Sequence, residues 1–165
     1  MRARNFLWNG GMLFLVALMS GCGSETSLGG SDTSVGGGET KFGNLYNGYF
    51  KNCKYCHAPD APGRTSEIEE TLDFSTEDTA YQTITQGRAS GLVGNQEACN
   101  GVPFVSNTYE TSLIAAVLDE EVRWNFSVGA CDRDSISDMT VKVGRPPSSE
   151  FLSALKEWIE TGTPR

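Results

Sequence analysis

The chain has 165 residues, of which 38% are hydrophobic and 21% charged, and its formal net charge at pH 7 is −8. This acidic balance argues against a nucleic-acid partner, because phosphates are bound through clusters of Lys and Arg. It favours a partner with a basic face, or else it only keeps a secreted domain soluble. Beyond its N-terminal tail the chain is long enough for one domain with a single core, which we expect at residues 42–165.

Residues 1–21 have the features of a secretory signal peptide. Arg2 and Arg4 provide a positive start, and the apolar run that follows at 12–19 is too short to span a bilayer. Cleavage after this segment would remove both arginines and no acidic residue, so the formal charge would move from −8 to −10. We therefore expect the chain to be secreted across the inner membrane.

The end of this segment, Leu18-Met19-Ser20-Gly21-Cys22, resembles a bacterial lipobox, whose cysteine is lipidated and becomes the mature N-terminus. A diacylglycerol together with an N-acyl chain would anchor the protein firmly to a lipid bilayer, facing the periplasm or the cell surface. The alternative is an ordinary cleaved signal in which Cys22 is incidental. Residues 22–41 are rich in Gly, Ser and Thr, so we expect a flexible linker between the lipid and the domain.

The run Cys53-Lys54-Tyr55-Cys56-His57 is a C-x-x-C-H sequence, which is typical of c-type haem attachment. Each of the two thiols can form a thioether to one vinyl group of the same haem, and the imidazole of the next residue can then bind the iron. His57 is the only histidine of the chain. A thioredoxin-like pair would need a βαβ setting, and a zinc site would need a second ligand pair, and the sequence offers neither. We therefore expect one covalent haem c on Cys53, Cys56 and His57.

Apolar residues at helical spacing predict a small all-α domain of four or five helices with long loops. The first expected helix leads directly into the haem motif, and the last begins at a Ser-Ser-Glu cap and ends near Gly162. The stretch 120–147 shows no helical pattern and is expected to be irregular, and no strand pattern or internal repeat is visible. The expected helices lie within residues 42–52, 75–87, 110–119 and 148–162.

Two further cysteines, Cys99 and Cys131, are left once the lipid and the haem have taken the other three. In an oxidising compartment a disulfide between them is expected. Such a bridge would stabilise the fold by roughly 3–4 kcal/mol on the loop-entropy estimate. The alternative is two buried thiols.

Met139 is the only methionine that would remain after signal cleavage, because Met1, Met12 and Met19 leave with the signal peptide. A thioether at the sixth iron position favours ferrous iron and raises the reduction potential. The alternative is a core gap-filler or an exposed residue, but the polar run at 135–140 argues against a core position. We therefore expect Met139 to be the distal iron ligand.

With these parts in place, residues 42–164 resemble a monohaem class I cytochrome c, most of all the c-type domains carried on bacterial lipoproteins and multidomain proteins. The matching features are Leu45–Phe50 ahead of the C-x-x-C-H motif, Met139 followed by Pro146-Pro147, and a tail from Leu155 to Pro164 of the form L-x-x-W-I-x-x-G-x-P. Thr140 stands where this family commonly has proline after the methionine, and residues 124–131 resemble an insertion.

The resemblance implies the cytochrome c fold, in which the first helix crosses the last near one haem edge. It also implies that His57 is the proximal and Met139 the distal ligand of the iron. The expected function is therefore electron transfer between redox protein donors and acceptors, without enzyme activity. A haem peroxidase or a small-gas sensor would need an open or displaceable distal position. A structural lipoprotein or thiol oxidoreductase without haem is the third possibility.

Overall fold

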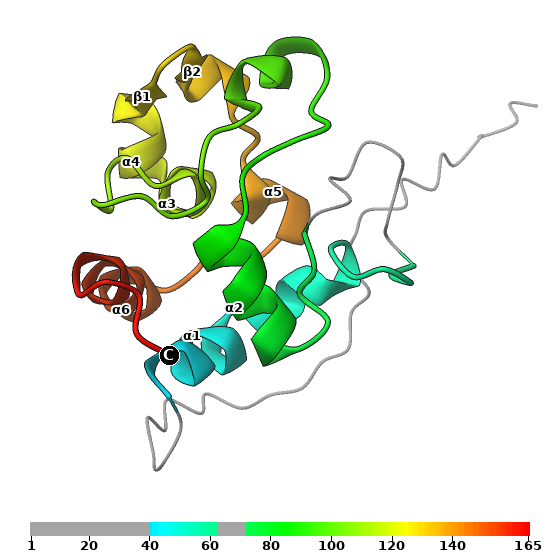
Figure 1. The fold of residues 1–165 in the computed structure, drawn as a ribbon, viewed down its shortest axis with the longest axis vertical. Helices are drawn as coiled ribbons and strands as arrows, with labels where there is room; N and C mark the ends of the chain where they lie inside the picture. The colour runs from blue at the N-terminus through cyan, green and yellow to red at the C-terminus, as the bar shows by residue number, and fades with distance from the viewer. Residues whose placement is uncertain (1–39, 63–71) are drawn as a thin grey trace, which may run out of the picture.

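The structure is a computed structural model, described here for residues 40–62 and 72–165. The expected signal peptide, Cys22 and nearly all of the linker lie outside these residues. The described part is a small, mainly helical domain, as the sequence predicts (Figure 1). Its helices are α1 (Lys41–Gly48), α2 (Glu77–Gln86), α3 (Leu113–Leu118), α4 (Glu120–Asn125), α5 (Met139–Val143) and α6 (Ser149–Glu160), with 3₁₀ helices at Phe50–Tyr55, Gly94–Cys99 and Arg133–Ser135.

The first and last helices pack together through aromatic side chains. Phe42 of α1 lies 5.2 Å from Trp158 of α6, measured between ring centroids, and both residues are buried. Phe151, near the start of α6, packs on the residues that follow α1, with its ring 5.0 Å from Tyr49 and 5.4 Å from Phe50. Phe42, Tyr49, Phe50 and Trp158 belong to the buried core and Phe151 packs against it, and burying aromatic side chains contributes strongly to stability.

Two helices begin and end where the sequence predicts. Thr76 caps α2 by accepting a hydrogen bond from the backbone N–H of Thr79, and the helix ends at Gly87. Ser148 caps α6 in the same way through the N–H of Phe151. Side-chain oxygens at these positions satisfy backbone donors that have no partner within the helix, which explains why the starts are readable from sequence.

The first helix differs from the expectation. It begins at Lys41, capped by Thr40, so the folded part starts slightly before residue 42. It also does not run unbroken into the haem motif: Tyr49 leaves helical geometry (φ −146°, ψ −50°), and a 3₁₀ helix continues from Phe50 to Tyr55. The first three residues of the C-x-x-C-H motif, Cys53 to Tyr55, therefore lie on a tighter turn than an α-helix would provide.

The stretch 120–147, expected to be irregular, contains regular structure. It holds α4, a small antiparallel hairpin of β1 (Ser127–Val128) and β2 (Cys131–Asp132), and α5. These elements are too short to show a hydrophobic period, and residues at their ends stabilise them. The side chain of Asp119 caps α4. Gly129 takes a positive φ of 63° in the hairpin turn.

A disulfide joins Cys99 to Cys131, the pairing expected from the sequence, with a Cα–Cα distance of 4.5 Å. Both residues are buried. The bond ties the β-hairpin to the 3₁₀ helix that ends at Cys99, and it closes a loop of 32 residues. It thereby fixes the chain shortly before α5.

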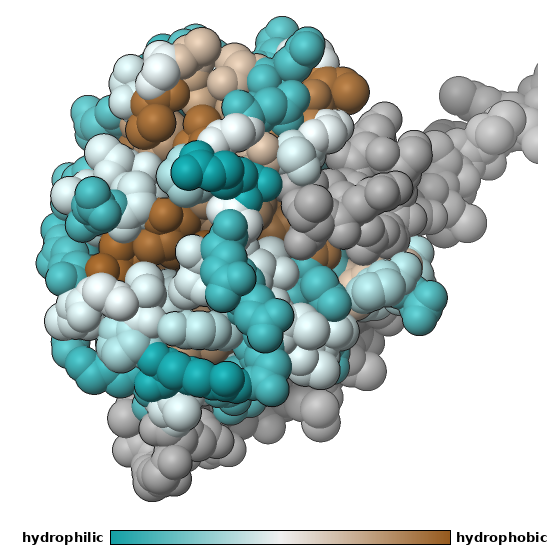
Figure 2. Space-filling view, viewed as in Figure 1, coloured by the Kyte–Doolittle hydropathy of each residue, from teal (hydrophilic) through white to brown (hydrophobic). Residues whose placement is uncertain are grey.

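Exposed apolar side chains are few and scattered. On the face shown in Figure 2, hydrophilic and intermediate residues separate small groups of apolar ones. Within residues 40–62 and 72–165, no helix is both long and apolar enough to cross a bilayer. The large apolar residues that the described part exposes are Tyr55, Val93, Trp124 and Val141.

Candidate functional site

The C-x-x-C-H residues lie on one compact turn. The backbone N–H groups of Cys56 and His57 both donate to the carbonyl of Cys53, at 3.1 and 2.8 Å. The second of these spans four residues, as in an α-helix, so the 3₁₀ helix widens as it ends. Side chains three and four positions apart on such a turn lie on the same side. Cys53, Cys56 and His57 are thus brought together by local geometry alone.

Aromatic residues line this turn. The His57 ring lies 5.9 Å from the ring of the buried Phe74, which in turn packs 5.8 Å from Phe50. The backbone N–H of Phe74 donates to the His57 carbonyl at 2.6 Å, and the hydroxyl of Tyr46 donates to the Phe74 carbonyl at 3.0 Å. These contacts fix the backbone at His57 and give its imidazole an apolar neighbour.

Two titratable groups at the turn, the Cys53 thiol and the Tyr49 hydroxyl, are partly withdrawn from water. Burial raises the pKa of the Cys53 thiol to about 12, so this sulfur is a neutral thiol at physiological pH. Burial also raises the pKa of Tyr49 to about 12, with smaller contributions from Cys53 and Asp138. Tyr49 therefore remains a hydrogen-bond donor over the physiological range.

Cys56 is disulfide-bonded, whereas Cys53 is a free thiol. A disulfide and a thioether to haem exclude each other at the same sulfur. Any haem on Cys56 therefore requires this sulfur in its reduced form.

Met139 is the first residue of α5, not part of a loop as the sequence suggested. The side chain of Asp138 starts this helix by accepting hydrogen bonds from the backbone N–H groups of Thr140 and Val141, at 2.9 and 3.3 Å. Gly144 ends it with a positive φ of 67°. Met139 is half-buried and packs against the core, although its polar neighbours in sequence argued against a core position.

Tyr49 connects α5 to the haem motif. Its hydroxyl donates to the carbonyl of Arg145, just beyond α5, at 2.9 Å. Tyr49 stands four residues before Cys53, so this bond links the chain just after α5 to the segment that leads into the cysteines. This role of Tyr49 could not be predicted from the sequence, where Tyr49 was only an apolar position of the expected first helix.

These residues fit a haem c by the chemistry of their donors. The thiols of Cys53 and Cys56 suit thioether bonds, and the imidazole of His57 and the thioether of Met139 are known axial ligand types. The aromatic surroundings of His57 suit a flat apolar macrocycle. Four donors from two segments of the chain thus form the candidate haem-binding site.

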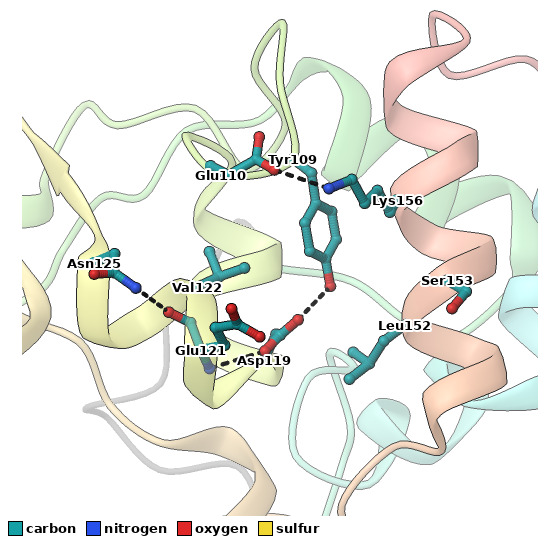
Figure 3. Close-up of a pocket in the computed structure, with 9 residues that line it drawn as sticks. All are labelled: Tyr109, Glu110, Asp119, Glu121, Val122, Asn125, Leu152, Ser153 and Lys156. Atoms are coloured by element: carbon teal, nitrogen blue, oxygen red, sulfur yellow. Dashed lines mark hydrogen bonds and ion pairs between the residues drawn. The ribbon is translucent and has the colours of Figure 1, made fainter.

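A separate groove of about 320 Å³ lies between α6 and the segment around α4 (Figure 3). Several of its polar groups interact with one another: the hydroxyl of Tyr109 donates to Asp119 at 3.1 Å, and Lys156 pairs with Glu110 at 3.0 Å. It includes none of the residues of the candidate haem site. We assign it no function.

No family model matches the chain, and no curated protein or solved structure matches it either. Among residues 40–62 and 72–165, no three His, Cys, Asp or Glu side chains converge as a metal-ion site. The candidate site is therefore defined by this chain's own residues.

Proposed function

We propose that this chain is a membrane-tethered, periplasmic electron-transfer protein of the class I cytochrome c type with one covalent haem. The observation that carries the proposal is the turn that groups the Cys53, Cys56 and His57 side chains within a single C-x-x-C-H motif. Redox proteins are its proposed donors and acceptors.

Each residue of the site has a specific task in this proposal. Cys53 and Cys56 would hold the haem covalently, and the His57 imidazole and the Met139 thioether would be the two protein ligands of its iron. When bound, the haem supplies an iron that gains and loses one electron. Ligation by two protein side chains leaves no iron position for a substrate, which favours electron transfer over peroxidase or gas-binding activity.

The arrangement of the helices supports the cytochrome c fold. The resemblance implies that the first helix crosses the last, and α1 packs against α6 through Phe42 and Trp158. The hydrogen bond from Tyr49 to the Arg145 carbonyl keeps the Met139 helix near the cysteine turn. Both features are consistent with the helix arrangement that the resemblance implies.

The test of this function is an absorption spectrum of the purified protein in both redox states. We expect sharp bands of a six-coordinate, low-spin haem that interconvert fully and reversibly on adding reductant and oxidant. The same protein should not turn over peroxide and should bind carbon monoxide only slowly. A protein without haem bands would contradict the proposal, and rapid carbon monoxide binding would favour the open-site alternative.

The proposed tether depends on Cys22, which the sequence places at the end of a lipobox. The variant Cys22→Ala is expected to lose the lipid, so the domain should move to the soluble fraction or stay unprocessed. Detergent partitioning followed by immunoblotting checks this, with Ser24→Ala as a matched control that leaves the lipobox intact. A Cys22→Ala protein still wholly in the detergent phase would refute lipidation.

A further inference from the structure

Arg123 on α4 forms an ion pair with the residue that precedes Met139. Its Nη2 lies 2.7 Å from Oδ2 of Asp138, and the two side chains are only 13% and 35% exposed. Exposed pairs contribute little, but this one is shielded from solvent on the Arg123 side, and hydrogen bonds to charged groups are among the stronger ones.

The same carboxylate starts α5 with its other oxygen. Oδ1 of Asp138 accepts from the backbone N–H groups of Thr140 and Val141 and from the Thr140 hydroxyl, the last at 2.5 Å. Both oxygens of Asp138 are thus used, one for the cap and one for Arg123. Because α5 has five residues, it is too short to be stable by itself and depends on such contacts.

Arg123 is itself fixed against the core. Its Nη1 lies 3.4 Å from the carbonyl oxygens of both Ala116 and Val117, at the end of α3, where helix carbonyls have no partner within the helix. Ala116 is fully buried. The guanidinium therefore joins three elements: its own helix α4, the end of α3 and the start of α5.

We propose that Arg123 is a positioning residue that acts through Asp138 to hold Met139 in place as the distal iron ligand. This inference rests on the proposed function. Without the ion pair, Asp138 keeps its cap hydrogen bonds to α5 but loses its link to α4, so the start of α5 is held to the rest of the domain by fewer contacts. Met139 then leaves the iron more often, and an external ligand gains access.

The test compares four holoproteins: the wild type, Arg123→Gln, Asp138→Asn and the double variant. Asparagine caps a helix about as well as aspartate, so Asp138→Asn removes the charge pair while retaining the cap. The matched control is Arg133→Gln, which removes an exposed ion pair with Asp134 and the contact of Arg133 with the Trp124 ring but leaves the Arg123–Asp138 pair in place. The measurements are the rate of carbon monoxide binding to the ferrous protein, the weak sulfur-to-iron band of the ferric protein, and the urea midpoint of unfolding.

We expect Arg123→Gln and Asp138→Asn each to speed carbon monoxide binding by about tenfold, which corresponds to about 1.4 kcal/mol. Each should also weaken the sulfur-to-iron band. The double variant should be no faster than either single variant, because both remove the same interaction. Arg133→Gln should match the wild type, and Arg123→Lys, which keeps the charge, should restore part of the wild-type rate.

Three results would overturn the inference. A lower urea midpoint with wild-type carbon monoxide binding in Arg123→Gln and Asp138→Asn would mean that the pair only stabilises the fold. Additive effects in the double variant would mean that Arg123 does not act through Asp138. A wild type that lacks the sulfur-to-iron band would refute ligation by Met139, and with it the role of Arg123. The first two results would refute only the role of Arg123 and leave ligation by Met139 standing.

Discussion

Met139→Leu is expected to abolish the weak sulfur-to-iron band of the ferric protein and to lower its reduction potential. Leucine keeps the apolar volume that packs against the core but has no donor atom for iron. Because axial ligands tune haem potentials over a range of about 0.8 V, we expect a drop on the order of 0.1 V or more. Optical redox titration measures it.

Two further variants separate ligation from packing. Met139→Ala should lose the band in the same way and should also lower the urea midpoint, because it removes half-buried apolar contacts. Val141→Ala changes a side chain on the same helix that is 74% exposed, and it should leave band, potential and stability unchanged. If the wild type binds carbon monoxide rapidly and Met139→Leu has an unchanged spectrum, Met139 is not the ligand and the open-site alternative leads.

Cys53→Ser with Cys56→Ser is the second change with a large expected effect. The double variant should carry no covalent haem, because serine hydroxyls do not form the thioethers that hold the macrocycle, and each single variant should carry less than the wild type. Lys54→Ala, between the two cysteines and exposed, is the matched control and should load fully. The measurement is the haem that remains with the protein after acid-acetone extraction. Equal retention in the wild type and the double variant would contradict attachment at these sulfurs.

Features that depend on neighbouring residues could be predicted from sequence. The start of α2 at Thr76 and of α6 at Ser148 follows from side-chain caps within three residues of each helix. The grouping of Cys53, Cys56 and His57 is equally local, because the motif spans a single turn. Such features need no knowledge of the rest of the fold.

Features that depend on distant residues could not be predicted. The end of α1 at Tyr49 coincides with a hydrogen bond to the Arg145 carbonyl, which lies 96 residues further along the chain. Helix α5 is too short to show a hydrophobic period, and its cap residue Asp138 also pairs with Arg123, 15 residues earlier in the chain. A helical Met139 that packs against the core follows from these tertiary contacts, not from its polar neighbours in sequence.

The haem-bearing peptide of the wild-type protein tests the central claim most directly. Mass spectrometry of a proteolytic digest should find one peptide that contains Cys53 and Cys56 and carries the added mass of one haem, with no disulfide at either sulfur. That result would also show that the disulfide at Cys56 is absent from the haem-loaded protein. The protein for this test is matured in a host that attaches haem to other C-x-x-C-H chains. A haem-free peptide in which Cys56 remains disulfide-bonded would contradict the account.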